Sequence, residues 1–153
     1  MVMLALSTEV SDSEAFADAE FNLKAFGDAE LMVAETRRFT VLDQHLIKVT
    51  ACWRSMSSDQ PAVVTLSITD GQNAHIQEQS HRIDTANVGQ AGGEMSRVLR
   101  VRQSGGDIKP GSHSFKLRAV RTVGFGTIVI QAAKKYPTEI RVEDLGVIPP
   151  HQL

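Results

Sequence analysis

The sequence predicts an all-β protein, an antiparallel β-sandwich of jelly-roll type with about eight to ten short strands and little helix. Three observations lead to this prediction. Apolar and polar side chains alternate along many short segments, which places one face of each segment in a core and the other in water. Turn residues separate these segments at intervals of roughly 8–15 residues. A sheet with one apolar face needs a second sheet to cover it, so we expect two stacked layers.

The first third of the chain gives weaker signals than the rest. Ser11 followed by Glu14 has the pattern of a helical capping box, which predicts a turn or two of helix, with a loop as the alternative. The polar residues 35–38 indicate a connection between two strands. In this region we expect short strands, the first of them an edge strand, at 1–6, 21–25, 31–33 and 39–42.

The middle of the chain contains the strongest strand signal. After a turn at Asp43-Gln44, one strand face carries Ile47, Val49, Ala51 and Trp53. The residues Asp70-Gly71-Gln72-Asn73 form a hairpin-turn sequence. The other elements that we expect here are, in order, a polar loop at 55–61, a strand at 64–68, an exposed or edge strand at 74–83, a glycine-bearing loop at 87–93 and a strand at 95–101.

The C-terminal third has the clearest alternation in the chain. Segments 115–119 and 140–143 carry apolar side chains on one face and polar ones on the other, and segment 128–132 places Ile128, Ile130 and Ala132 on one face. Gly124-Phe125-Gly126 separates segments 115–119 and 128–132, and because glycine reaches positive φ without a Cβ clash, it predicts a tight reversal. We therefore expect the three segments to pair with one another as an antiparallel meander with one solvated face.

Length and composition indicate one domain without a membrane span. The chain has 153 residues. No apolar run approaches the roughly 20 residues that crossing a bilayer requires, and the opening residues lack the basic flank of a signal peptide. The single cysteine, Cys52, excludes an intrachain disulfide, and we interpret it as a small buried hydrophobe beside Trp53. These features predict a protein that is made, and stays, in a cytoplasm.

Charge is unevenly distributed along the chain. Residues 1–35 carry eight acidic side chains and one basic one, whereas the remainder carries fifteen basic and ten acidic ones. We divide the chain into an acidic N-terminal arm (1–20), a sandwich domain (21–147) and a C-terminal tail (148–153). Because charge complementarity steers association, one hypothesis places the arm on the basic body of its own or a neighbouring subunit. The alternative is scattered, solvated surface charge.

No arrangement of side chains predicts an enzyme, and we assign no catalytic, cofactor-binding or metal-binding residue. His75 and His81 share one strand face but are about 20 Å apart, too far to bind one ion. The Asp70–Asn73 segment lacks the spaced carboxylates of a calcium loop, and Gly124-Phe125-Gly126 is not followed by the helix of a dinucleotide site. Three carboxylates near Arg141 are interpreted as solvated charge rather than as a glycosidase pair: Glu139, Glu143 and Asp144.

The distribution of basic and aromatic residues disfavours two binding functions. Nucleic-acid sites add stacking aromatics to basic residues, and carbohydrate modules rely on exposed tryptophan and tyrosine platforms. This chain has one tryptophan and one tyrosine, and Trp53 has the parity of the core. We therefore expect a salt-bridged or interface sheet face from the following six residues: Arg97, Arg100, Arg102, Lys116, Arg118 and Arg121.

Four passages, in their order along the chain, are similar to a known family: 38–51, 66–71, 111–119 and 136–146. The most specific is Ile140–Gly146, with the pattern aliphatic-x-Val-Glu-Asp-aliphatic-Gly. Together they resemble a β-sandwich domain of tail proteins, often minor tail or fibre components, of tailed phages that infect actinobacteria. The resemblance covers roughly residues 18–147. It implies a virion component that has no catalytic residues to transfer.

The resemblance implies that the chain is a structural protein of a tailed bacteriophage, a minor tail or fibre-like component. Such a protein would be located in the virion and assembled in the host cytoplasm. Many weak contacts summed over repeated copies would retain it on the particle. Expected partners are other virion proteins and copies of the chain itself, with a trimer as one candidate, and a host-surface glycan is a further candidate. We expect neither nucleic-acid binding, nor membrane insertion, nor a cofactor.

Two alternatives stay open at this point. Larger relatives carry the domain at the end of fibre-like chains, whereas no fibre repeat precedes it in this sequence. A capsid decoration or head-fibre protein would have the same compact size. A carbohydrate-binding module that recognises the host envelope is the second alternative.

Overall fold

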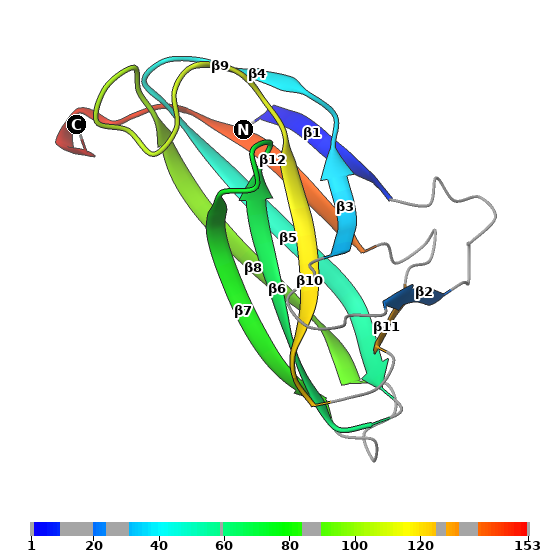
Figure 1. Ribbon diagram of the computed structural model, residues 1–153. Helices are drawn as coiled ribbons and strands as arrows, with labels where there is room; N and C mark the ends of the chain where they lie inside the picture. The colour runs from blue at the N-terminus through cyan, green and yellow to red at the C-terminus, as the bar shows by residue number, and fades with distance from the viewer. Residues whose placement is uncertain are drawn as a thin grey trace.

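The computed structural model describes residues 2–9, 20–23, 31–58, 60–83, 90–124, 128–131 and 138–152. In this part of the chain, antiparallel sheets form two layers that face each other across a common apolar core (Figure 1). The only helical element described is a short 3₁₀ turn, η2 (Pro150–Gln152). No helix among these residues has the length and hydrophobicity that crossing a bilayer requires. The predicted antiparallel β-sandwich is confirmed.

The first layer is built around the long central strand β5, which pairs with β8 on one side and with β12 and β11 on the other. Strand β2 pairs with the outer edge of β11, and β1 with the outer edge of β12. The strands of this layer are β1 (Val2–Glu9), β2 (Glu20–Leu23), β5 (His45–Ser58), β8 (Gln90–Val101), β11 (Ile128–Gln131) and β12 (Glu139–Val147).

The second layer has the pairing order β3-β10-β6-β7. Its strands are β3 (Leu31–Thr36), β6 (Ala62–Asp70), β7 (His75–Ile83) and β10 (Phe115–Gly124). Strand β1 pairs with β12 near its start and with β3 near its end, so it passes from one layer to the other. At one end of the sandwich, β4 (Phe39–Val41) and β9 (Gly111–His113) form a separate two-stranded sheet.

On the side opposite β1, the two layers end in the edge strands β7 and β8. Arg97 of β8 reaches across this seam, and its Nη1 donates a hydrogen bond to the carbonyl oxygen of Ile76 at 2.6 Å. Strand β7 is polar and largely exposed, as the sequence predicted for an edge strand. The sandwich is therefore joined by backbone pairing on one side and by an arginine contact on the other.

The predicted meander is wrong. Strand β10 lies in the second layer between β3 and β6, whereas β11 and β12 lie in the first layer and both pair with β5. A two-residue alternation of apolar and polar side chains indicates which face of a strand is buried. It does not indicate which strand lies beside it. The chain changes layer after Gly124 instead of reversing within one sheet.

Two strands are longer than the sequence predicted. Strand β5 continues to Ser58, through the segment expected to be a polar loop, because it pairs there with β8 and β11. Strand β8 begins at Gln90, inside the expected glycine-bearing loop. Backbone pairing continues in both strands irrespective of side-chain polarity, so polar or glycine-rich composition did not mark the strand ends.

Some predictions concern residues outside the described ranges. The Ser11–Glu14 capping box and the reversal at Phe125-Gly126 are among them. Residues 2–9, part of the segment that we divided off as an acidic arm, form β1 within the sandwich, and Ile148 of the expected tail is buried. The division of the chain into arm, domain and tail stays a prediction.

The core has the composition that the alternation predicted. The buried faces of β5, β6, β10 and β12 contribute to one cluster together with Val33, Met95 and Leu99 from β3 and β8. Each fully buried leucine or isoleucine contributes about 1.5–3 kcal/mol relative to an exposed one, so this cluster is the main source of stability. The predicted core residues that are buried are Ile47, Val49, Ala51, Trp53, Val64, Leu66, Ile68, Phe115, Leu117, Ala119, Ile140 and Val142.

Trp53 connects the two layers near the β7–β8 seam. Its ring lies opposite Gly93 of β8 and makes an edge contact with the ring of His81 of β7, with 5.3 Å between the centroids. Within the described residues, the buried Nε2 of His81 has no hydrogen-bond partner. Burial lowers the pKa of His81 below its ordinary value of 6.5.

This environment predicts a pH dependence of stability. Because the pKa of His81 is lower in the folded protein, the unfolded chain binds more protons as the pH falls below about 6.5, and the unfolding free energy decreases. We expect the melting temperature to fall more between pH 7.5 and pH 5.5 in the wild type than in His81→Gln. Differential scanning calorimetry of both proteins measures the difference. Equal slopes would contradict the assignment.

Candidate functional site

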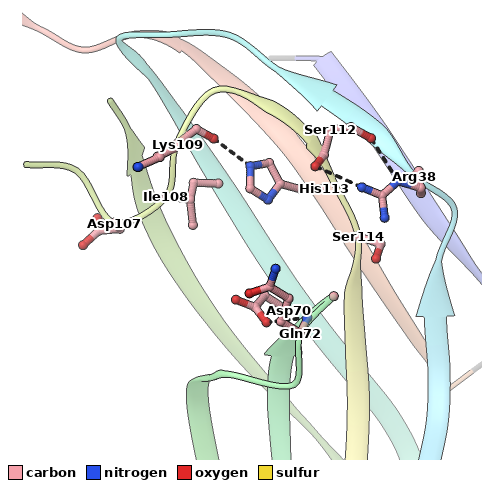
Figure 2. Close-up of a pocket in the computed structure, with 10 residues that line it drawn as sticks. Arg38, Asp70, Gln72, Asp107, Ile108, Lys109, Ser112, His113 and Ser114 are labelled. Carbon is pink, nitrogen blue, oxygen red and sulfur yellow. Dashed lines mark hydrogen bonds between the residues drawn. The ribbon is translucent and has the colours of Figure 1, made fainter. Parts of the chain in front are cut away.

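A polar cleft of about 400 Å³ lies at the end of the sandwich that carries the small β4–β9 sheet (Figure 2). A smaller hollow of about 190 Å³ adjoins it, and the two share Asp70, Asp107 and Ile108. Three segments distant in sequence form the cleft: the β6–β7 turn, the β8–β9 loop with β9 and Ser114, and Arg38 just before β4. Its lining residues are Arg38, Asp70, Gly71, Gln72, Asp107, Ile108, Lys109, Ser112, His113 and Ser114.

The β6–β7 turn forms one wall of the cleft. Oδ1 of Asp70 accepts hydrogen bonds from the backbone N–H groups of Gln72 and Ala74, at 2.8 and 2.9 Å. Asn73 has a φ of 65°, a left-handed conformation that asparagine tolerates better than most residues. This geometry confirms the predicted hairpin turn and fixes the orientation of the Asp70 carboxylate.

The β8–β9 loop supplies a second carboxylate. Oδ2 of Asp107 accepts a hydrogen bond from the backbone N–H of Arg100 at 2.8 Å, and the Arg100 Nε lies 3.7 Å away. The backbone N–H of Asp107 donates in turn to the carbonyl oxygen of Arg100 at 2.9 Å. Asp107 is therefore held against the end of β8 by interactions at both its backbone and its side chain.

Arg38 and the residues of β9 form the wall opposite the β6–β7 turn. Nε of Arg38 donates to Oγ of Ser112 at 3.0 Å, and Nη2 donates to the Ser112 carbonyl oxygen at 3.3 Å. Nε2 of His113 lies 2.6 Å from the carbonyl oxygen of Lys109. Because a carbonyl oxygen only accepts, that ring nitrogen carries the hydrogen. In Figure 2, His113 and Arg38 lie across the cleft from Asp70 and Gln72, and Lys109 lies on the same loop as Ile108 and Asp107.

The cleft thus presents both hydrogen-bond donors and hydrogen-bond acceptors to a ligand. Within the described residues, Oδ2 of Asp70, Oδ1 of Asp107 and Nη1 of Arg38 take part in no internal hydrogen bond. Two carboxylates and two cations give the lining a formal charge of zero with His113 neutral. No group of three or more His, Cys, Asp or Glu side chains among the described residues could hold a metal ion.

A second surface at the same end of the molecule is apolar. It comprises side chains on β1, β12 and the β4–β5 turn that are exposed by 38–68%. The two strands pair directly, and the backbone N–H of Ile148 donates to the carbonyl oxygen of Gln44, which brings the turn beside them. We call this set the apolar strip, although Val2 and Met3, as consecutive strand residues, point to opposite faces of β1; its members are Val2, Met3, Leu42, Leu145 and Val147.

Comparison with known proteins assigns no family to this chain. No family model matches the sequence, and no curated protein is similar to it. An arabinose-bound α-L-arabinofuranosidase is similar in structure, with a TM-score of 0.41 and 10% identity over 83% of this chain and 19% of that chain. The enzymatically active domain of tailspike protein 4 of bacteriophage CBA120 gives a TM-score of 0.35 and 12% identity over 95% of this chain and 18% of that chain.

A third similar structure is the CBM22-1 xylan-binding domain of Paenibacillus barcinonensis Xyn10C, with a TM-score of 0.38 and 8% identity over 93% of each chain. The present chain therefore spans about a fifth of the length of the arabinofuranosidase and tailspike chains and nearly all of the xylan-binding domain. At these TM-scores and identities, the similarities assign neither an activity nor a ligand to this chain.

The interpretation of Asp144 as solvated charge is wrong. Its carboxylate lies 2.9 Å from Nδ1 of His45 and accepts a hydrogen bond from the backbone N–H of Gly146 at 2.7 Å. Burial opposes its ionisation, but these hydrogen bonds outweigh that effect and lower the pKa of Asp144. Asp144 and His45 thus form a half-buried pair between the ends of β12 and β5. Glu139 and Glu143 flank Arg141 at 3.7 and 3.6 Å, but their side chains are only 19% and 12% exposed, so the interpretation as solvated charge is wrong for them as well.

The six basic residues do not share one sheet face. Arg97 and Arg100 lie on β8 in the first layer, whereas Lys116 and Arg118 lie on β10 in the second. Arg97 joins the seam and Arg100 pairs with Asp107, while Lys116 and Arg118 both donate to Oδ1 of Asn73. The predicted basic face is therefore divided between separate structural contacts.

Cys52 is half-buried rather than buried, and it lies between Glu94 and Glu139 on the two neighbouring strands. Its parity is opposite to that of the inward-facing Trp53. Burial and the Glu94 carboxylate, whose oxygen is 3.7 Å from the sulfur, raise the pKa of the Cys52 thiol. Because the thiolate is the reactive form, this environment makes Cys52 a poor nucleophile.

Sequence reasoning missed the cleft because its parts lie far apart in the chain. Asp70, Asp107 and Arg38 belong to three connections, and no motif spacing links them. One signal was available for part of the cleft. The turn sequence from Asp70 to Asn73 and the Gly105-Gly106 loop both predict connections, and connections of a sandwich gather at its ends.

Proposed function

We propose that this chain is a non-catalytic structural component of a tailed-phage virion, most specifically of the tail, and that it attaches to a neighbouring virion protein through the apolar strip. The observation that carries this proposal is the exposure of five large apolar side chains on paired strands and an adjoining turn. Large apolar side chains that neighbouring elements leave exposed are candidates for contact with another protein. The resemblance of residues 140–146 to phage tail domains supports the virion as the setting.

The contacts elsewhere in the sandwich support a structural role. The carboxylates beside Arg141 pair with it, and Asp144 pairs with His45. The Cys52 thiol is held protonated by its surroundings. None of these described groups forms the nucleophile–base pair that acyl or glycosyl transfer requires. Attachment by repeated weak contacts needs no such pair, because copies on a particle add their contributions.

Incorporation into particles tests the proposal. Val147→Asp in the phage that encodes the chain places a charge in the apolar strip, and we expect at least about tenfold fewer copies in purified particles, because a charge transferred from water into an apolar contact is strongly unfavourable. Quantitative mass spectrometry of purified virions measures the copy number. The matched control is Val123→Asp. Val123 is 60% exposed and Val147 68% exposed, but Val123 lies on β10 and is not a member of the apolar strip.

The position on the particle separates the tail from the capsid alternative. Immunogold labelling of intact virions should mark the tail. Labelling of the capsid would favour the decoration or head-fibre alternative while keeping the structural role. Absence of the chain from purified particles, or equal incorporation of both variants, would overturn the proposed attachment.

A further inference from the structure

We propose that the polar cleft is a binding site for a neutral carbohydrate, a ligand separate from the protein partner of the apolar strip. This proposal goes beyond the virion attachment described above and does not depend on it. It rests on three properties of the cleft: its volume, the balance of its charges and the fixed orientation of its polar side chains.

The volume and shape suit a small ligand rather than a macromolecular surface. The cleft measures about 400 Å³, and the adjoining hollow adds about 190 Å³ on the far side of Asp70 and Asp107. Pockets for small molecules typically measure about 300–1,000 Å³. Because the two hollows share Asp70, Asp107 and Ile108, a ligand longer than one sugar ring would extend from one into the other.

The charge balance selects among ligand classes. The carboxylates of Asp70 and Asp107 repel an anion such as phosphate, and the cationic Arg38 and Lys109 repel a cation. Among the described lining residues, Ile108 carries the only apolar side chain, which is too little for a hydrophobic ligand. A neutral hydroxylated molecule avoids all three penalties.

Hydroxyl groups fit this lining for a second reason. Each hydroxyl both donates and accepts hydrogen bonds, so neighbouring hydroxyls on a sugar can donate to a carboxylate and accept from a cation at the same time. The lining of the cleft combines the carboxylates of Asp70 and Asp107 with the donors of Arg38 and Lys109; Arg38 lies across from Asp70, and Lys109 lies on the same loop as Asp107 (Figure 2). Ile108 supplies an apolar surface for the C–H face of a sugar ring.

Internal hydrogen bonds hold three of these side chains, those of Asp70, Asp107 and Arg38, in place before a ligand binds. Asp70 uses Oδ1 for the turn, Asp107 uses Oδ2 for the end of β8, and Arg38 uses Nε and Nη2 for Ser112. One polar atom of each side chain is left for a ligand. Because the side chains are already ordered, binding costs less conformational entropy. A surface cluster of mobile charges would lack this property.

Nuclear magnetic resonance titration of the ¹⁵N-labelled protein with sugars tests the proposal. The neutral probes are glucose, galactose, mannose, arabinose, maltose and cellobiose, and the charged probes are glucuronate and glucosamine. We expect at least one neutral sugar to shift the amide signals of Gly71, Gln72, Lys109 and Ser112 in a saturable manner at millimolar concentration. Saturable shifts with a charged probe alone, or shifts confined to other surfaces, would overturn the proposal. No saturation up to about 50 mM sugar, roughly the weakest dissociation constant that such a site supports, would also overturn it.

Two substitutions separate binding from folding. Asp70→Asn keeps an oxygen that can accept from the N–H groups of Gln72 and Ala74, but it replaces the remaining acceptor by a donor, so we expect binding to weaken at least about tenfold. Lys109→Met removes the amine and keeps the backbone carbonyl that holds His113. The control is Glu78→Gln, an exposed carboxylate of β7 outside the cleft.

Outcomes for the variants are equally decisive. Weaker binding in Asp70→Asn and Lys109→Met, with unchanged melting temperatures and unchanged binding in Glu78→Gln, supports the site. Binding that is equal in all four proteins would place the sugar elsewhere and overturn the proposal. Neither result bears on virion incorporation, because the apolar strip is intact in every variant.

Discussion

A Gly93→Ala variant is expected to lose about 2–3 kcal/mol of unfolding free energy, because the added methyl group meets the ring of Trp53. A Cβ at position 93 would lie 2.5 Å from Cζ2 and 2.7 Å from Cε2 of Trp53. Trp53 is 3% exposed and is also in contact with the ring of His81, so it has little room to move. Urea unfolding followed by far-ultraviolet circular dichroism measures the loss, because this signal is kept when Trp53, the single tryptophan of the sequence, is replaced.

Two further variants show whether the clash is the cause. Gly105→Ala is the matched control: its φ of 74° makes any side chain unfavourable by about 1–2 kcal/mol, but nothing lies within 4 Å of the added Cβ. Trp53→Phe in the Gly93→Ala background removes the clashing ring atoms. We expect Gly93→Ala to cost clearly less there than in the wild type. An additive result would contradict the proposed contact.

Gly93 also explains one error of sequence interpretation. The glycine-bearing segment 87–93 predicts a loop, since glycine weakens a strand. In the structure, Gly93 lies within β8 and pairs directly with Trp53 of β5. Its missing side chain makes space for the large ring of its neighbour. A glycine in a strand can thus be a packing requirement set by another strand, which sequence alone does not reveal.

The buried faces of the strands were predictable, whereas their neighbours were not. Alternation identified Ile47, Leu66 and Leu117 as core residues, and all three are fully buried. The same alternation was compatible with several pairings, and β10 joins β3 and β6 instead of β11. Pairing depends on which edges meet when the two layers stack, and this is a property of the whole chain.

The positions of Asp144 and His45 along their strands predict that both side chains lie on the core side. Asp144 shares parity with Ile140 and Val142, and His45 shares parity with Ile47. Both polar residues therefore lie on the core side of their strands, near the strand ends, where they pair at 2.9 Å. A charged residue on a core face requires a partner, so the pairing was open to prediction. The cleft was not, because three separate connections form it.

The second large effect is expected at Phe115, where Phe115→Ala should lower the unfolding free energy by about 3–5 kcal/mol. Phe115 is completely buried, and its ring stacks on that of Phe39 with 5.7 Å between the centroids. Its backbone N–H donates to Oγ1 of the buried Thr36 at 3.0 Å. The substitution would leave a cavity between β10 and the small β4–β9 sheet. Urea unfolding measures the loss.

The same substitution should also affect the cleft, because Phe115 anchors the residues that form one of its walls. Ser112, His113 and Ser114 immediately precede it, and Phe39 follows Arg38. Phe115→Leu is the control: it fills much of the space, so we expect a loss of about 1–2 kcal/mol and amide signals at the cleft close to those of the wild type. In Phe115→Ala, the signals of Ser112 and Lys109 should shift or broaden even where the protein stays folded. A loss below about 1 kcal/mol for Phe115→Ala would show that the small sheet is not packed on the core through this pair of rings.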